Sequence, residues 1–263
     1  VGSGVTLSAL QDKLSQQNQW LPIRPPFGTT ETTIGALVAT AEVGPERLAY
    51  GAPRDMLLGL QYIDSSGSMV SAGGKVVKNV AGYDVSRLQA GALGTLGVLT
   101  RITIKTQPRP EHGQTLAYEM TAHEAIDTMN RRAGQPKPLN GACWFGGRLY
   151  LRLSGAASAV THTVREWGGE QLTEDKSPWK GMAEHTLPFF SGDDPLWRLS
   201  VRSSARLDEH LGETLIDWCG AQRWVRTGRT PNDSEPTELR AAAEAGGGHL
   251  CLYRGGDRSG EVR

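Results

Sequence analysis

A glycine-rich stretch from Gly73 to Thr100 holds the residue types in this chain that are best suited to ligand binding. It combines six glycines with Lys75, Lys78 and the pair Tyr83-Asp84. Glycines let a backbone approach a flat or phosphorylated ligand and leave its N–H groups unobstructed. The two lysines could offset negative charge on that ligand. The pattern predicts contact with a cofactor. A pair of tight turns whose small residues only allow close packing explains the same residues equally well.

The segment Thr32-Thr-Ile-Gly-Ala36 is a second candidate, at the expected start of a short helix over residues 33–40. A helix N-terminus carries unpaired N–H groups and a partial positive charge, which suit a pyrophosphate. Many helices begin with Thr and contain a Gly. Taken alone, the pattern therefore favours an N-cap with close helix packing over a ligand site.

Other patterns that carry chemistry are incomplete. Gly2-Ser-Gly4 lacks the third glycine of a dinucleotide fingerprint, and no phosphate-binding loop or Gly-x-Ser-x-Gly elbow occurs. The cysteines Cys143, Cys219 and Cys251 have no Cys-x-x-Cys spacing, and the six histidines are scattered. We therefore expect free thiols, no iron–sulfur cluster and no metal site held by this chain alone.

Charge and hydropathy restrict the function further. Lys plus Arg and Asp plus Glu each total 28, and this balance argues against a nucleic-acid partner. No run of about 18 apolar residues exists, so we expect no transmembrane segment. No leader is visible, and we expect a cytoplasmic protein, or one held at the inner face of the plasma membrane by partners. The first residue is Val1 rather than Met, which suggests a start inside a larger protein.

The elements that must position the glycine-rich stretch follow from periodicity and turn signals. We expect helices over 6–17, 33–40 and 85–90, a hairpin of 56–63 with 68–71, and a half-buried strand over 98–105. The run Gln107-Pro-Arg-Pro110 is the expected domain boundary. Beyond it we expect strands at 115–120, 148–153, 197–202, 223–226 and 249–253, and helices at 122–133, 156–167 and 235–245. This order indicates an α+β domain whose helices cover one face of a mainly antiparallel sheet.

Several segments, taken in order, resemble the PCMH-type FAD-binding domain of the vanillyl-alcohol oxidase superfamily. Within it they look most like the FAD-binding subunits of bacterial glycolate oxidases. The matching stretches are LPIRPP (21–26), TIGALVA (33–39), GAPRDMLLG (51–59), GGKVVKNVAGYDVSRL (73–88), GTLGVLT (94–100), LPFF (187–190), LWRLS (196–200) and IDWCGAQRW (216–224). The stretch GGKVVKNVAGYD is specific, whereas GTLGVLT alone indicates only the superfamily.

The resemblance implies an α+β fold: the second subdomain of the FAD-binding domain over 1–108, then a cap-like FAD-linked oxidase C-terminal domain over 109–263. It also implies an FAD whose pyrophosphate and flavin run along residues 33–39. The residues carried over as cofactor-binding are Thr33, Gly35, Ala36, Ala39, Arg54, Asp55, Gly82, Tyr83, Asp84, Gly97, Val98, Leu99 and Thr100. No catalytic residue can be carried over.

The chain departs from the family pattern in three ways. Ala36 stands where the family usually has a second glycine, which narrows the approach of the cofactor. Glu46 replaces an arginine of the family's Gly-Pro-Arg-Arg run and so removes one positive charge. The first FAD subdomain, with its pyrophosphate loop, should precede Val1, and a C-terminal Asn-Pro-Gly-Arg segment is missing after Arg263. We therefore expect this 263-residue chain to bind FAD poorly by itself, and one equivalent of co-purifying flavin would contradict that expectation.

The family's reaction gives the functional expectation. A 2-hydroxy acid such as glycolate loses a hydride to the flavin and a proton to a base, yielding the 2-oxo acid. The implied partners are a flavin-containing catalytic subunit and an iron–sulfur subunit that receives the electrons. Two alternatives stay open. The protein could be a single-subunit FAD-dependent 2-hydroxy acid dehydrogenase, or a non-catalytic assembly subunit of the complex.

Overall fold

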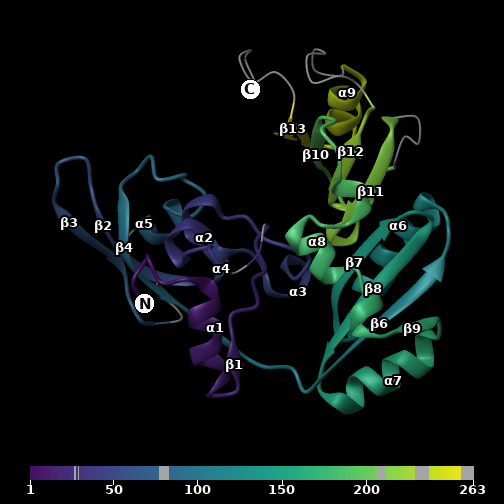
Figure 1. Cartoon of the computed structure of the whole chain (residues 1–263), viewed down its shortest axis with the longest axis horizontal. Helices are drawn as coiled ribbons and strands as arrows, with labels where there is room; N and C mark the ends of the chain where they lie inside the picture. Colours follow the sequence, from purple (N-terminus) through teal and green to yellow (C-terminus); the bar gives the residue numbers. More distant parts are fainter. Residues whose placement is uncertain (27, 29, 77–82, 207–210, 229–236, 256–263) are drawn as a thin grey trace. The chain divides into compact units, whose positions relative to one another are not determined.

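The computed structural model describes residues 1–26, 28, 30–76, 83–206, 211–228 and 237–255 (Figure 1). The chain divides into two compact units. The first comprises Val1–Arg109 with Met182–His185, and the second comprises Pro110–Gly181 with Thr186–Arg263. The division after Arg109 falls inside the proline-containing run, where the main chain loses ladder hydrogen bonds.

A three-stranded antiparallel sheet with the order β3-β2-β4 forms the frame of the first unit. The predicted hairpin is confirmed. The Asp64 carboxylate accepts N–H bonds from Ser66 (2.8 Å) and Ser68 (3.0 Å) and so fixes the turn between its strands. The elements of this unit are α1 (Leu7–Ser15), β1 (Gln19–Trp20), α2 (Ile34–Thr40), α3 (Arg47–Tyr50), α4 (Pro53–Met56), β2 (Leu57–Ile63), β3 (Met69–Gly73), α5 (Val85–Leu88), β4 (Val98–Ile104) and β5 (Gln107–Pro108).

The core of this unit joins the short helix α2 to the sheet. Ile34 and Leu37 of α2 and Ile102 of β4 are fully buried, and Leu60 of β2 is nearly so. Complete burial of a branched aliphatic side chain is worth about 1.5–3 kcal/mol, so a helix of seven residues is held by packing rather than by its own propensity.

The second unit contains one eight-stranded antiparallel sheet with the order β13-β10-β12-β11-β7-β8-β6-β9, which confirms the expected α+β class. Its strands are β6 (His112–Glu119), β7 (Leu139–Phe145), β8 (Arg148–Gly155), β9 (Glu170–Leu172), β10 (Leu196–Ser200), β11 (Glu213–Asp217), β12 (Gln222–Arg226) and β13 (His249–Arg254). Its helical elements are α6 (Ala122–Ala133), α7 (Ala157–Trp167), η1 (Glu174–Lys176), η2 (Pro188–Phe190), η4 (Trp218–Gly220) and α9 (Thr237–Ala245). Helix α8 (Trp179–Glu184) begins in this unit, and its residues from Met182 onward are assigned to the first.

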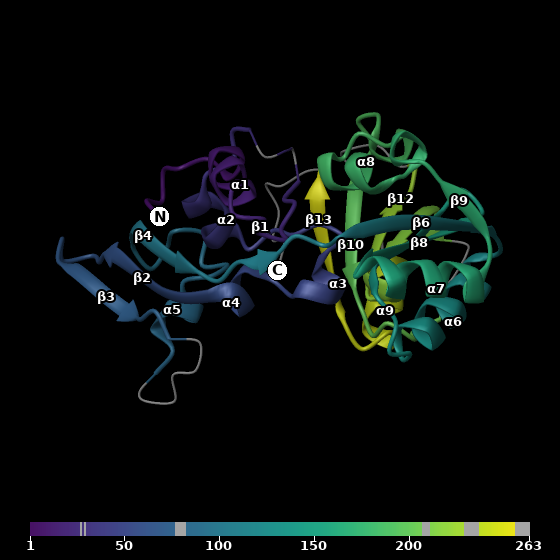
Figure 2. The same ribbon diagram turned by 90° about the horizontal axis from the view of Figure 1, so that it is seen from below.

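Helices α6, α7 and α9 cover one face of this sheet (Figure 2). Val160 of α7 packs on Leu116 and Leu153, and Leu239 of α9 packs in a second buried cluster with Val225. The strand register places all these strand residues on the same side. The predicted one-sided helix layer is therefore observed.

Three strands of this sheet, β7, β9 and β11, were not predicted. The Asn140-Gly141 pair in β7 coincides with a bulge in its pairing to β8, which interrupts the alternation that identifies a strand. β9 has only three residues, and β11 (ETLID) has only two apolar residues at adjacent positions. These strands form because neighbouring strands supply their hydrogen bonds. The hydrophobic periodicity of a single segment does not reveal such neighbours.

The Trp179 indole anchors the opposite face of the sheet. Its Nε1 donates to the Thr115 hydroxyl at 2.8 Å, and both side chains are buried. We predict that Thr115→Val leaves the indole N–H unsatisfied and lowers the free energy of unfolding by about 1–3 kcal/mol. Urea denaturation followed by circular dichroism measures this change.

The matched control is Thr163→Val on α7. Thr163 is also buried, but its hydroxyl donates to the Ala159 carbonyl four residues back within the same helix. Because that carbonyl keeps its helical N–H partner, we expect a loss below about 1 kcal/mol. Equal losses of unfolding free energy in the two variants would show that the Trp179–Thr115 hydrogen bond adds no stability beyond that of a hydroxyl bonded within a helix.

Candidate functional site

The segment Val1–Val5 joins the start of α2 to the edge of β4. Ser3 N–H donates to the Thr100 carbonyl at 3.0 Å, while the Ser3 carbonyl accepts from Gly35 N–H at 2.8 Å. Val1 exchanges two 2.9 Å main-chain bonds with Ile102. The segment therefore brings the two predicted cofactor stretches, residues 33–39 and 97–100, to either side of one short strap.

The first turn of α2 uses its N–H groups within the protein. Ile34 N–H donates to Val5 and Gly35 N–H to Ser3, and the Thr33 hydroxyl accepts from Ala36 N–H at 3.1 Å. A Cβ on Gly35 would lie 2.9 Å from the Ser3 Cβ, so glycine is needed for this approach. The N-cap and close packing anticipated for the TIGA pattern are both present, and Ala36 lies exposed beside them.

The loop after α5 ties the other end of α2 to β4. Gly91 N–H donates to Val38 (3.0 Å) and Leu93 N–H to Ala39 (2.9 Å). Ala39 is half-buried beneath this loop. Helix α2 is thus held at both ends by segments that lead into or pair with β4.

Gly97 is the tightest point of the predicted main-chain contact region. Its φ of +141° is strained for any L-residue, and a Cβ there would lie 2.6 Å from the Ile63 carbonyl oxygen and 2.7 Å from the Tyr62 ring. The Thr100 hydroxyl donates to the Gln61 carbonyl at 3.1 Å, at the bulge between β2 and β4. Val98 is 66% exposed and Leu99 is half-buried.

The remaining predicted residues form a separate group around α4 and α5. The Asp55 carboxylate accepts from Ala52 N–H at 2.9 Å and closes the start of α4, while Arg54 is exposed. Asp84 caps α5, and Tyr83 is 98% exposed. Gly82 lies outside the described residues, as does Lys78.

Two guanidinium groups act on Asp84. The Ser86 hydroxyl, the Arg87 N–H and the positive charges of Arg87 and Arg54 together lower the pKa of this carboxyl below its usual value. Arg87 Nε lies 3.2 Å from Asp84 Oδ2. Arg87 and Ser86 were not among the predicted site residues. Their positions two and three residues after a candidate cap could have identified them.

Glu46 has a role that its place in the sequence did not indicate. Its buried carboxylate lies 3.0 Å from Arg24 Nε, which belongs to the LPIRPP segment. Gly44 also packs on the Arg24 carbonyl, where a Cβ would lie at 2.6 Å. Glu46, which stands where the resemblance places an arginine, therefore forms an internal ion pair with Arg24 that holds two loops together.

Exposed large hydrophobic side chains are concentrated in the first unit. The large hydrophobic side chains that are exposed among the described residues all belong to this unit: Val1, Val5, Met69, Val76, Tyr83, Leu88, Leu93, Leu96 and Val98. Two of them, Leu96 and Val98, flank Gly97, so part of this exposed apolar surface lies in the predicted main-chain contact region.

The second unit provides no obvious redox or metal centre in its described part. The described residues contain no group of three or more His, Cys, Asp or Glu that could hold a metal ion. All three cysteines are free, as expected. Burial raises the pKa of Cys143 and raises that of Cys219 to about 12, so both thiols stay protonated at neutral pH. None of the described helices has the length and apolar character needed to cross a bilayer.

Comparison with solved structures shows the fold. An alkyldihydroxyacetonephosphate synthase superposes on 76% of this chain with a TM-score of 0.56 and 15% sequence identity. This chain covers 45% of that protein. At this identity the likeness extends to the fold alone.

Comparison of sequences shows the family and its cofactor. Residues 1–73 match the family model described as FAD binding domain. A D-lactate dehydrogenase of Archaeoglobus fulgidus is 35% identical over 49% of this chain and 28% of its own length. Glycolate oxidase subunit GlcD of Bacillus subtilis is 40% identical over 36% of this chain and 20% of its own length. Glycolate oxidase subunit GlcE of Escherichia coli is 38% identical over 97% of this chain, which spans 71% of that relative. The chain belongs to the GlcE family of FAD-linked glycolate oxidase subunits.

Proposed function

We propose that this chain is part of the FAD-binding subunit of a glycolate oxidase complex. The complex oxidises glycolate or a related 2-hydroxy acid to the 2-oxo acid and passes the electrons through flavin to an iron–sulfur subunit. The observation that carries the proposal is the convergence of residues 33–39 and 97–100 on the Val1–Val5 strap. Family membership and the match to the FAD binding domain support it.

Named residues of this chain would hold the cofactor. Thr33, Gly35, Ala36 and Ala39 would border it along α2, and Gly97–Thr100 would meet it through main-chain atoms. Tyr83 and Asp84, with Gly82, would close the site from the α5 side, where Arg54 and Asp55 brace it. When bound, FAD supplies the two-electron redox chemistry. The residues named above position the FAD, and the glycines among them leave space for it because they carry no side chain.

An assembly role for this subunit is the second candidate. The first-turn N–H groups of α2 bond to Ser3, Val5 and the Thr33 hydroxyl, and this arrangement leaves less main-chain capacity for a pyrophosphate. A single-subunit dehydrogenase would need cationic groups for the substrate carboxylate. In the second unit, Arg226 bonds to Asp194 at 2.5 Å, and Arg254 bonds to the Phe190 carbonyl at 2.5 Å. These two arginines hold the η2 segment through the Phe189 and Phe190 carbonyls.

The proposal is tested with the full-length protein co-expressed with the other subunits of its complex. We predict that the purified complex carries FAD, and that glycolate bleaches the visible flavin absorbance in the absence of oxygen. D-lactate and a 2-oxo acid serve as substrate-class comparison and negative control. Full glycolate turnover by the partner flavin subunit without this one would rule out an essential role, and a complex without flavin would rule out the cofactor.

Gly97 provides a direct test of the cofactor site. We predict that Gly97→Ala lowers the ratio of flavin to protein in the purified full-length protein about tenfold, equivalent to ~1.4 kcal/mol of binding free energy. The added methyl group would meet Ile63 and Tyr62 and would push residues 97–100 out of place. Flavin absorbance per mole of protein measures the effect.

The control for backbone strain is Gly67→Ala in the β2–β3 turn. Gly67 has a φ of +81°, and no atom lies within 4 Å of the position where its Cβ would stand. This variant carries the cost of positive φ without a steric clash. We expect it to keep the wild-type flavin ratio. Equal flavin loss in both variants would indicate general destabilisation instead of a local cofactor contact.

A further inference from the structure

Two arginines of the first unit, Arg54 on α4 and Arg87 on α5, share a single carboxylate. Arg87 Nε lies 3.2 Å from Asp84 Oδ2, and the positive charge of Arg54 also acts on this carboxyl. All three side chains belong to exposed residues. Because one carboxylate offsets only one of the two guanidinium charges, the group keeps one positive charge in excess at the surface.

The Asp84 carboxylate holds Arg87 in a defined place. Its Oδ1 accepts the Ser86 hydroxyl at 2.8 Å and the Arg87 N–H at 3.1 Å, while its Oδ2 faces Arg87 Nε. Ser86 is buried, and its Oγ would lie 3.1 Å from a Cβ placed on Gly73 at the end of β3. Ser86 therefore anchors Asp84, and through it the Arg87 side chain, to the sheet of the first unit.

The remaining donors of the two guanidinium groups are available to a ligand. Arg87 uses Nε, and within the described residues no hydrogen bond or ion pair occupies its Nη groups or any nitrogen of Arg54. Other arginines are engaged: Arg148 and Arg226 bond to carboxylates, and Arg223 donates to main-chain carbonyls. A guanidinium with unused Nη donors suits a phosphate or another delocalised anion, because its fork of donors matches several acceptors at once.

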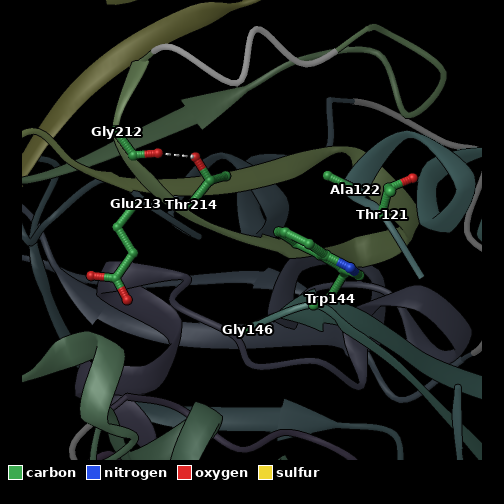
Figure 3. Close-up of a pocket in the computed structure, with 8 residues that line it drawn as sticks. Thr121, Ala122, Trp144, Gly146, Gly212, Glu213 and Thr214 are labelled. Atoms are coloured by element: carbon green, nitrogen blue, oxygen red, sulfur yellow. Dashed lines mark hydrogen bonds between the residues drawn. The ribbon is translucent and has the colours of Figure 1, made fainter. Parts of the chain in front are cut away.

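The pocket of the second unit offers no such group (Figure 3). The described residues that line it include no lysine or arginine, and the Glu213 carboxylate among them lies 3.7 Å from Arg226. The Thr214 hydroxyl donates to the Gly212 carbonyl at 3.1 Å, as the figure shows. An anionic ligand therefore meets uncompensated positive charge at Arg54 and Arg87 and not in this pocket.

We propose that Arg54 and Arg87 bind a negatively charged part of FAD, and that Asp84 and Ser86 are positioning residues for Arg87. The inference rests on the proposed function, which sets the cofactor beside Tyr83 and Asp84. FAD carries negative charge on its pyrophosphate in both redox states, and its isoalloxazine ring gains negative charge on reduction. Both sources present a delocalised anion to the guanidinium groups, and the measurements below distinguish them.

Arg54→Gln and Arg87→Gln test the proposal in the full-length protein, each within its co-expressed complex. Flavin is removed, the dissociation constant of oxidised FAD is measured by titration, and the midpoint potential of the reconstituted flavin is determined. For a pyrophosphate contact we expect each variant to raise the dissociation constant about tenfold at an unchanged potential, because oxidised and reduced FAD lose the same interaction. For a contact with the reduced ring we expect an unchanged dissociation constant and a potential lower by about 30 mV, the equivalent of tenfold for a two-electron couple.

The matched control is Arg165→Gln on α7. Arg165 is exposed, and within the described part of the chain no hydrogen bond or ion pair engages it, so we expect wild-type values. Salt separates a charge effect from a structural one, because screening weakens the contact in the wild type and leaves less to weaken in the two test variants. Wild-type dissociation constants and potentials in both test variants would overturn the proposal. Changes that Arg165→Gln reproduces, or changes that do not depend on salt, would also overturn it.

Failure of the proposed function gives a different result. A complex that binds FAD through the two arginines, but whose flavin glycolate does not reduce, contradicts the proposed function and supports the arginine site. Normal flavin reduction by glycolate with wild-type values in both test variants contradicts the arginine site alone. A wild-type complex that binds no FAD contradicts both.

Discussion

The first unit depends on a few main-chain hydrogen bonds made by its N-terminal strap, Val1–Val5. Ser3 bonds to Thr100 on one side and to Gly35 on the other, and Val5 accepts from Ile34. These bonds fix the distance between α2 and β4, and the buried contacts of Ile34 and Leu37 follow from it. A bridge of this kind tolerates no Cβ at Gly35, because Ser3 occupies that space. The glycine of the TIGA pattern is therefore explained by packing before any cofactor is considered.

Several charged groups of the described residues hold loops in place. Glu46 and Arg24 join two loops of the first unit through a buried ion pair. In the second unit, Arg226 and Arg254 donate to the Phe189 and Phe190 carbonyls and so fix η2. A guanidinium suits this task because its fork of donors satisfies several acceptors at once. The exposed group of Arg54, Asp84 and Arg87 differs, because its charges remain at the surface, where a ligand can reach them.

The two units contrast in how completely they cover their apolar residues. The second unit buries its large hydrophobic residues between a sheet and three helices, and its described part leaves none of them exposed. The first unit leaves nine exposed, several of them near the Val1–Val5 strap and the Gly91–Gly97 loop. The described part of the second unit therefore presents less exposed apolar surface than the first unit does.

The sequence by itself determined the α+β class, the hairpin, the α1 helix, the α2 helix with its Thr cap, and the relation to FAD-linked subunits. These features are local, because capping residues, turn residues and alternation act over a few positions. Only the tertiary structure decided that Ser3 lies between Gly35 and Thr100, that Glu46 pairs with Arg24, and that Arg54 and Arg87 surround Asp84. It also decided that, among the described residues, β7 and β11 pair at Ile216 and Trp144 alone. Such features depend on contacts between residues that are distant along the chain, and no pattern in a short window records which distant segment supplies the partner.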